Sequence, residues 1–234
     1  MKTIILAGGY GTRISEYTKK IPKPMIKVGG LPLLTHIMRI FSFQGHNEFI
    51  IAAGYKKKII QNYYSKSKEF PNLKVIDTGK ETMTGGRILK LKSFFHEKEN
   101  FFVTYGDGLS DINLKKIEKF HLKHKKIATV TAVRPPVRFG ELSIQNTRVI
   151  KFKEKPEIKS SWINGGFFVL NYKVFKYIKN YKVSFEKEPL EKLSKIKNLM
   201  AFKHQGFWKC MDNLADKNHL EKLCKNNNLM KWKR

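Results

Sequence analysis

The segment LAGGYGTR, residues 6–13, follows the apolar run TIIL and places three glycines and an arginine where a buried strand would end. Glycines at such a point let the backbone turn sharply and approach a ligand closely. Exposed amides of the turn suit phosphate, and the planar, permanently charged guanidinium of Arg13 fits phosphate oxygens. These residue types predict a phosphate-binding loop. A plain strand–turn–helix junction is the alternative that the glycines alone leave open.

Neither of the two common phosphate motifs fits this loop. The dinucleotide-binding pattern G-x-G-x-x-G matches at Gly9 and Gly11, but its third position is Ile14. The P-loop pattern also fails, because no Gly-Lys-Ser/Thr follows. The phosphate compound is therefore not identified by the loop alone.

Two further glycine-containing segments could complete a site. In YGDG, residues 105–108, the carboxylate of Asp107 follows an apolar strand. Magnesium takes one or two protein carboxylates together with phosphate oxygens, although an ordinary Asp-Gly turn is the alternative. TGGR, residues 84–87, opens an expected helix, where backbone amides are free. Ligands of open parallel sheets bind beyond the carboxyl ends of the strands, so we expect the three segments to surround one cleft.

The composition sets limits on the class of protein. A chain of 234 residues with 41% hydrophobic content suits one domain with a substantial core. No apolar run approaches the ~20 residues of a membrane span, and glycines interrupt the short apolar N-terminal stretch, so we expect neither a membrane partner nor a signal peptide. Two cysteines, Cys210 and Cys224, give no disulfide framework, which favours the cytoplasm.

The formal charge of +28 does not choose the function. A basic chain can bind nucleic acid, an anionic membrane face or small anionic substrates. The lysines are spread along the whole sequence, as a codon bias would place them, and no nucleic-acid-recognition motif is visible. We therefore expect no nucleic-acid partner. DNA binding remains the alternative, and retention on DNA at moderate salt would reveal it.

Strand and helix signals alternate along the first part of the chain, which favours an α/β fold with a doubly wound, mostly parallel sheet. After Pro135 and Pro136, short strand-like runs follow one another with only turns between them, which predicts a small antiparallel subdomain. The expected strands are 2–8, 48–54, 73–77, 100–108 and 127–133, then 140–145, 149–155 and 165–171 in the antiparallel part, and a last strand over 199–208. The expected helices are 31–45, 56–66, 84–95, 111–126, 173–179, 186–196 and 215–227.

The motifs, taken in order, resemble those of the sugar nucleotidyltransferase family. They are LAGGYGTR, IPKPMIKVGG, YGDG, EKP and NGGFFVL. The narrower stretches DTGKETMTGGR and GFWKCMD resemble members that transfer a cytidylyl group from CTP to glucose 1-phosphate. The resemblance covers essentially the whole chain. It implies a Rossmann-like domain of the nucleotide-diphospho-sugar transferase type over 1–234, with a nucleotide-binding part of about 1–134 and a sugar-phosphate-binding part of about 135–234.

The implied reaction joins a nucleoside triphosphate to a sugar 1-phosphate and releases pyrophosphate. The attacking oxygen is already anionic, so the difficulty is repulsion among phosphates, and catalysis is mostly positioning and cations. The resemblance implies catalytic roles for Arg13, Lys23 and Asp107, and a cofactor Mg²⁺ held by Asp107 and Asp212. The alternatives are a solvated loop lysine at Lys23 and a helix N-cap at Asp212.

The remaining contacts also follow from the resemblance. It implies nucleotide binding by Leu6, Gly8, Gly9, Gly11, Thr12, Arg13, Lys23, Thr84, Gly85, Gly86 and Arg87, with backbone groups around the paired glycines reading the cytosine. It implies sugar-phosphate binding by Gly140, Glu154, Lys155, Asn164, Gly165 and Gly166. Ordinary turns, bulges and charged strand ends are the alternatives for the second set. Trp208 is expected to shape the pocket wall, and Cys210 to be an inert thiol.

The stretch before Asp77 is shorter than the family usually has, which leaves a homo-oligomer open. The substrates implied are CTP and glucose 1-phosphate. The same chemistry on another nucleotide or sugar is the nearest alternative, and a non-catalytic nucleotide-sugar sensor is a more distant one.

Overall fold

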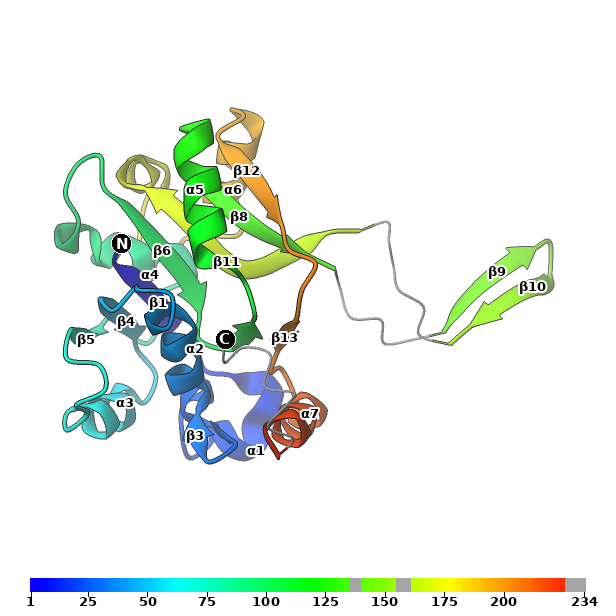
Figure 1. The fold of residues 1–234 in the computed structure, drawn as a ribbon, viewed down its shortest axis with the longest axis horizontal. Helices are drawn as coiled ribbons and strands as arrows, with labels where there is room; N and C mark the ends of the chain where they lie inside the picture. Colours follow the sequence, from blue (N-terminus) through cyan, green and yellow to red (C-terminus); the bar gives the residue numbers. More distant parts are fainter. Residues whose placement is uncertain (135–139, 155–160, 226–234) are drawn as a thin grey trace.

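The computed structural model describes residues 1–134, 140–154 and 161–225. Its centre is a seven-stranded sheet with the strand order β12-β8-β11-β6-β1-β4-β5 (Figure 1). The strands of this sheet are β1 (Thr3–Ala7), β4 (Phe49–Ala53), β5 (Leu73–Asp77), β6 (Asn100–Tyr105), β8 (Ala128–Val133), β11 (Ile163–Asn171) and β12 (Leu199–Lys203).

The sheet is mostly parallel, with one antiparallel strand in the middle. Strands β6, β1, β4 and β5 run parallel to one another, and β12 runs parallel to β8. Strand β11 is antiparallel to both β6 and β8. The expected α/β class with a mostly parallel sheet is confirmed. The run 165–171 was expected in the antiparallel subdomain. It lies in the main sheet instead, because its apolar side chains are buried there between two neighbouring strands.

Helices cover both faces of the sheet, as the burial of β1 shows. Ile5 packs into one apolar cluster with α2, α3, α5 and α7, whereas its neighbour Ile4 packs into a second cluster with α4, the 3₁₀ turn η4 and α6. Alternate residues of a strand point to opposite faces, so a strand buried on both sides is apolar throughout. The helices are α1 (Ser15–Thr18), α2 (Leu33–Ser42), α3 (Lys57–Tyr64), α4 (Thr84–Lys90), α5 (Leu114–His124), α6 (Glu188–Lys195) and α7 (Leu214–Lys225), and the 3₁₀ turns are η1 (Thr12–Ile14), η2 (Lys23–Met25), η3 (Lys92–Phe94) and η4 (Tyr172–Tyr177).

The helix predictions are confirmed in position, and the expected helices before α7 are shorter than predicted, whereas residues 226 and 227 of the expected last helix lie outside the described residues. The expected helix over 84–95 ends as α4 at Lys90 and continues as the separate turn η3. The segment 173–179 is the 3₁₀ turn η4. Helix α5 begins after Asn113, whose side chain accepts the N–H of Lys116, so Asn113 is the cap. Among the described residues, no helix has the length and apolar character needed to cross a bilayer.

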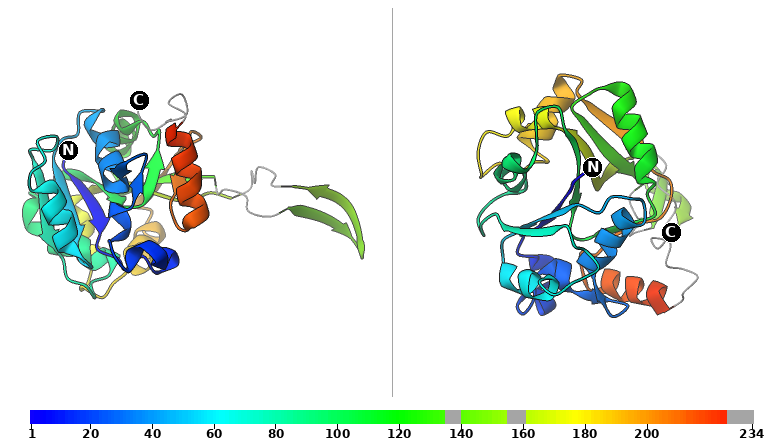
Figure 2. Two further views of the ribbon diagram at one scale, coloured as in Figure 1. Left: turned by 90° about the horizontal axis from the view of Figure 1, so that it is seen from below. Right: turned by 60° about the vertical axis from the view of Figure 1, so that its left-hand side comes forward.

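Three two-stranded sheets lie outside the main sheet. They pair β2 (Lys27–Val28) with β3 (Leu31–Pro32), β7 (Gly108–Ser110) with β13 (Trp208–Cys210), and β9 (Glu141–Gln145) with β10 (Arg148–Lys153). The single strand expected over 199–208 is therefore two strands, β12 and β13, in different sheets. The hairpin β9–β10 stands clear of the body in Figure 1 and in the left view of Figure 2.

Candidate functional site

A cavity of about 680 Å³ opens at one edge of the main sheet. The parallel strands β1 and β6 both end there, because carboxyl ends of parallel strands share an edge. Antiparallel β11 brings its beginning, not its end, to the same edge. The cavity is thus lined by the loop after β1, the segment 104–108, the segment 164–167 and the segment 80–84, and it extends to Trp208, Cys210 and Asp212.

The loop after β1 is shaped to leave room for a ligand. Gly11 has a φ of +66°, a conformation that favours glycine. A β-carbon on Gly8 would lie 2.1 Å from Nη1 of Arg87, whereas one on Gly9 would meet nothing within 4 Å. The loop therefore packs against Arg87 at Gly8 and leaves free space at Gly9. This agrees with a loop that a phosphate compound can approach closely.

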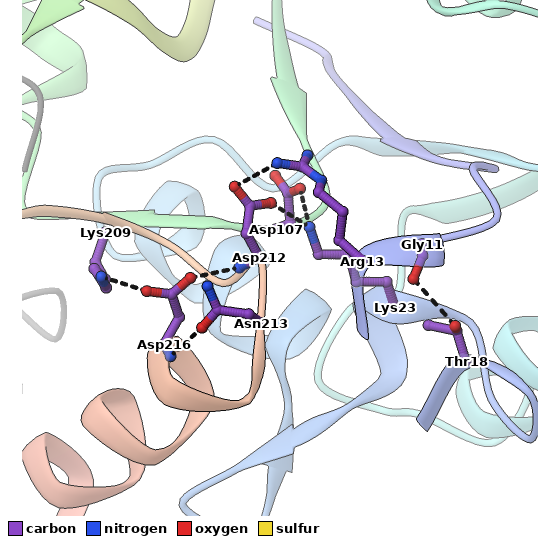
Figure 3. A network of polar contacts seen from close by, with 9 residues as sticks. All are labelled: Gly11, Arg13, Thr18, Lys23, Asp107, Lys209, Asp212, Asn213 and Asp216. Carbon is purple, nitrogen blue, oxygen red and sulfur yellow. Dashed lines mark hydrogen bonds and ion pairs between the residues drawn. The ribbon is translucent and has the colours of Figure 1, made fainter. Parts of the chain in front are cut away.

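Four charged side chains from distant parts of the chain form one network in the cavity (Figure 3). Lys23 Nζ lies 2.7 Å from Oδ2 of Asp107 and 2.9 Å from Oδ1 of Asp212. Arg13 Nη1 donates to Oδ2 of Asp212 at 2.8 Å. The side chain of Lys23 is 10% exposed and that of Arg13 is 72% exposed. We call Arg13, Lys23, Asp107 and Asp212 the charge cluster. Lys23 is not the solvated loop lysine of the alternative interpretation.

The charge cluster stabilises its own ionised forms. Burial by itself would lower the pKa of Lys23, but the charge and hydrogen bond of Asp107, with the hydrogen bond of Asp212, raise that pKa above its ordinary value. Burial likewise opposes ionisation of Asp212, yet the hydrogen bond and charge of Lys23 and the charge of Arg13 lower its pKa. Lys23 is therefore a cation and Asp212 an anion at neutral pH.

The donor set of the cluster fits magnesium. Among the described residues, Asp107, Cys210 and Asp212 form a group whose ligand atoms all lie within 4.8 Å of one another. Mg²⁺ prefers oxygen ligands, and two carboxylates are its usual protein contribution beside phosphates. Burial raises the pKa of the Cys210 thiol, so it stays protonated and is a poor ligand. The two carboxylates are thus the fitting pair, and the thiol is inert as expected.

Arg87 is a buried support for three loops and not a group that reaches into solvent. Its guanidinium donates to the carbonyls of Gly8, Gly79 and Lys80 at 2.8, 2.7 and 3.2 Å, to that of Ala53 at 3.4 Å, and to the hydroxyl of Thr78 at 2.6 Å. Arg87 is 4% exposed, and it is among the residues that line the cavity. Arg87 was expected to bind the nucleotide; in the structure its guanidinium bonds to these five protein groups, and a contact with the nucleotide stays a prediction.

Gly85 and Gly86 do not line the cavity. A β-carbon on Gly86 would lie 2.2 Å from the carbonyl oxygen of Tyr181, and one on Gly85 would lie 2.8 Å from that of Val183. The glycines let α4 pack against the segment 181–185. A side chain at Gly86 would therefore meet the backbone of Tyr181, and the expectation that backbone groups around the paired glycines read the cytosine stays a prediction.

Residues that the sequence did not single out form one wall of the cavity. Glu186 accepts the hydroxyls of Tyr105 at 2.5 Å and of Thr84 and Ser184 at 2.6 Å each. Although burial opposes its ionisation, these hydroxyls lower the pKa of Glu186. Asn164 donates to the hydroxyl of Tyr105 at 3.3 Å. Glu186 is the first residue of the expected helix 186–196, where an exposed glutamate is ordinary, so the local sequence carries no signal for this role.

The start of β11 is held at the cavity by neighbouring strands. Gly166 has a φ of +78°, and its missing side chain makes room for the ring of Tyr105. Trp208 donates its indole N–H to the carbonyl of Gly165 at 2.7 Å, which joins β13 to this wall. Asn164 accepts the N–H of Gly166 at 2.8 Å. Trp208 shapes the pocket wall, as expected.

The other predicted sugar-phosphate residues lie elsewhere or outside the described chain. Gly140 and Glu154 are exposed at the base of the hairpin β9–β10 and are not among the residues that line the cavity. Lys155 lies outside the described residues. The structure thus does not bring Gly140 or Glu154 to the cavity, and the role of all three residues stays a prediction. The predicted residues that do line the cavity are Leu6, Gly8, Gly9, Gly11, Thr12, Arg13, Lys23, Thr84, Arg87, Asp107, Asn164, Gly165, Gly166 and Asp212.

Comparison with known proteins identifies the class of this chain. Residues 2–215 match the family model described as Nucleotidyl transferase, and the chain belongs to this family. Within it, the chain is 44% identical to glucose-1-phosphate cytidylyltransferase of Salmonella typhi over 245 aligned residues, covering 95% of each chain. It is 40% identical to the probable glucose-1-phosphate cytidylyltransferase of Bacillus subtilis, covering 91% of each. These matches confirm the resemblance seen in the motifs.

Solved structures agree with this family. HddC from Yersinia pseudotuberculosis, complexed with GMP-PN, superposes with a TM-score of 0.74 at 26% identity, covering 94% of this chain and 98% of that one. A putative glucose-1-phosphate thymidylyltransferase from Bacillus anthracis superposes with a TM-score of 0.77 at 23% identity, covering 97% and 96%. The second likeness supports the fold alone.

Proposed function

We propose that this nucleotidyltransferase moves the cytidylyl group of CTP to α-D-glucose 1-phosphate, releasing pyrophosphate and forming CDP-glucose, with Mg²⁺ as cofactor. The observation that carries the proposal is the charge cluster beside the glycine loop, in which Lys23 lies between two carboxylates. Two relatives at 40% and 44% identity carry that activity in their names, which supports the choice of CTP and glucose 1-phosphate.

Cationic residues bind the phosphates of the substrates in this proposal, and the two carboxylates bind the metal. The glycine loop offers a close backbone approach to the triphosphate, and the exposed Arg13 moves from Asp212 to the departing β- and γ-phosphates. Lys23 is nearly buried, and once the two carboxylates hold the metal its ammonium is free to face the α-phosphorus and offset the charge that grows there. No strong general base is needed, because the attacking phosphate oxygen is already an anion. Asp107 and Asp212 hold Mg²⁺, which, when bound, neutralises phosphate charge and orients the leaving group.

The part of the cavity lined by Tyr105, Asn164, Gly165 and Glu186 is suited to an uncharged group. Asn164, Gly165 and the hydroxyl of Tyr105 present hydrogen-bonding groups, and the anionic Glu186 disfavours a phosphate there. A hexose ring has hydroxyls for such a wall, while its 1-phosphate is drawn toward Lys23. This arrangement orders the substrate along the cavity without a catalytic side chain on the sugar side.

The test is a grid of four nucleoside triphosphates against several sugar 1-phosphates, with pyrophosphate release as the readout and Asp107→Asn as the control. We expect release with CTP and glucose 1-phosphate and at least tenfold less with UTP, because a mismatched base edge leaves groups unpaired at ~1–3 kcal/mol each. Release with another pair would keep the chemistry and change the substrate. Release in no pair would favour the sensor alternative.

Two finer properties belong to the same proposal. A second copy of the chain covers the hairpin β9–β10, whose apolar side chains are exposed, with Phe152 62% exposed. Light scattering of the purified protein would give a single-chain mass if this is wrong. The reaction takes place in the cytoplasm, which supplies CTP and keeps the free thiols of Cys210 and Cys224 reduced.

A further inference from the structure

Asp212 lies in a short joint between β13 and α7, and two successive backbone amides hold that joint. The N–H of Met211 donates to the carbonyl of Asp107 at 2.9 Å, which ties the joint to the other acidic residue of the charge cluster. The N–H of Asp212 itself donates to Oδ2 of Asp216 at 3.0 Å. The backbone next to the Asp212 side chain is therefore held by two acceptors, the carbonyl of Asp107 and the carboxylate of Asp216.

Asp216 is buried and has a paired charge. The residue is 6% exposed, and its second oxygen, Oδ1, lies 2.5 Å from Nζ of Lys209 on β13 (Figure 3). Lys209 offsets a negative charge that would otherwise add to the repulsion around Asp212. The N–H of Asp216 donates to Oδ1 of Asn213 at 2.9 Å. Asn213 is thus the N-cap of α7, and Asp212 is not the cap that the alternative interpretation made it.

From this geometry we infer that Asp216 is a positioning residue, which aims the Asp212 carboxylate at the metal through the backbone N–H of Asp212. The inference rests on the proposed function, in which Asp212 is a ligand of Mg²⁺. A metal site needs its ligands held in orientation by outer partners, and losing such a partner typically lowers metal affinity 10–100-fold. Asp216 is not among the residues that line the cavity, so it acts only through Asp212.

Stabilising the first turn of α7, which Asn213 caps, is the simpler role for Asp216, and the two roles predict different measurements. A cap stabilises α7, which Asn213 also does. A positioning residue changes the contribution of the metal to nucleotide binding and leaves metal-free binding unchanged. The ratio of two dissociation constants for CTP, one in EDTA and one in Mg²⁺, measures that contribution. It is obtained by calorimetry without sugar phosphate, so that no turnover occurs.

The matched variants are Lys209→Met/Asp216→Leu and Lys209→Met/Asp216→Asn. Both remove the buried ion pair together, so that no lone buried charge remains. They have side chains of similar shape and differ in whether position 216 can accept the N–H of Asp212. We expect the ratio to fall about tenfold in the Leu variant and to stay within about twofold of wild type in the Asn variant. Asn213→Ala, which weakens the cap alone, leaves the ratio unchanged.

Equal ratios in the Leu and Asn variants, with both folded by circular dichroism, would overturn the inference. So would a fall in Asn213→Ala as large as in the Leu variant, because the effect would then come from the helix cap. Asp212→Asn separates this failure from that of the proposed function. If Asp212→Asn keeps the wild-type ratio, Asp212 is not a metal ligand, and the metal assignment fails first.

Discussion

Replacing Lys23 with methionine should move two properties of the protein in opposite directions. The ammonium lies 2.7 and 2.9 Å from the carboxylates of Asp107 and Asp212, and its side chain is 10% exposed. Removing one such preorganised charge at a reacting phosphate lowers turnover about 10²–10³-fold, which is roughly 3–4 kcal/mol of transition-state stabilisation. Pyrophosphate release at saturating CTP, glucose 1-phosphate and Mg²⁺ measures this loss.

The same change should make the free protein a better binder of Mg²⁺. In the structure the ammonium of Lys23 already neutralises both carboxylates, so a metal ion must displace it. Without that ammonium the two carboxylates repel each other, which lowers Tm in EDTA. Added Mg²⁺, without nucleotide, then relieves the repulsion and raises the Tm of Lys23→Met more than that of wild type.

Lys116→Met is the matched control, because Lys116 is an exposed lysine on α5. It should change neither turnover nor the response of Tm to Mg²⁺. The reasoning would be refuted if Lys23→Met kept more than about a tenth of wild-type turnover. It would also be refuted if Mg²⁺ raised its Tm no more than that of wild type, since Lys23 would then not compete with the metal.

Other predictions follow from particular contacts. Gly86→Val should lower Tm by several degrees in thermal scans, with no selective rise in KM for CTP, because its side chain meets the backbone of Tyr181. Arg87→Lys removes most of the five hydrogen bonds by which the guanidinium joins the glycine loop at Gly8 to the segment 78–80 and Ala53. The KM for CTP in initial-rate assays should therefore rise about tenfold. Burial lowers the pKa of His121 to about 4, below its ordinary 6.5. As the pH falls, the histidine of the unfolded protein is therefore protonated before that of the folded protein. The free energy of unfolding in urea should therefore fall as the pH drops from about 6.5 to 4, and fall less in His121→Gln.

The sequence was informative where function depends on local backbone. The loop 8–13 and Asp107 were identified because glycines at a strand end have few structural purposes, and the fold places both at one cavity. The role of Asp212 was harder to predict, because an aspartate just before a helix is also typical of an N-cap. The true cap is its neighbour Asn213, which only the hydrogen bond to Asp216 N–H reveals.

Three features could not be read from the sequence for one physical reason, which is that the sequence does not say what a side chain faces. A glycine in a helix looks the same whether its missing β-carbon makes room for a base or for the backbone of Tyr181, as at Gly86. The run 165–171 was grouped with the hairpin because apolar strands look alike, although it is buried within the main sheet. Glu186 was missed because its hydroxyl partners come from Tyr105 and Thr84, far away in the sequence.

The central claim is that the phosphate oxygen of the sugar attacks the α-phosphorus of CTP in the charge cluster. The most direct test incubates the protein with CTP, Mg²⁺ and glucose 1-phosphate labelled with ¹⁸O at its three terminal phosphate oxygens, and weighs the products by mass spectrometry. The account predicts CDP-glucose that keeps all three labels, equimolar unlabelled pyrophosphate, and neither product from Asp107→Asn. Label in the pyrophosphate, or unlabelled CMP in place of CDP-glucose, would contradict it.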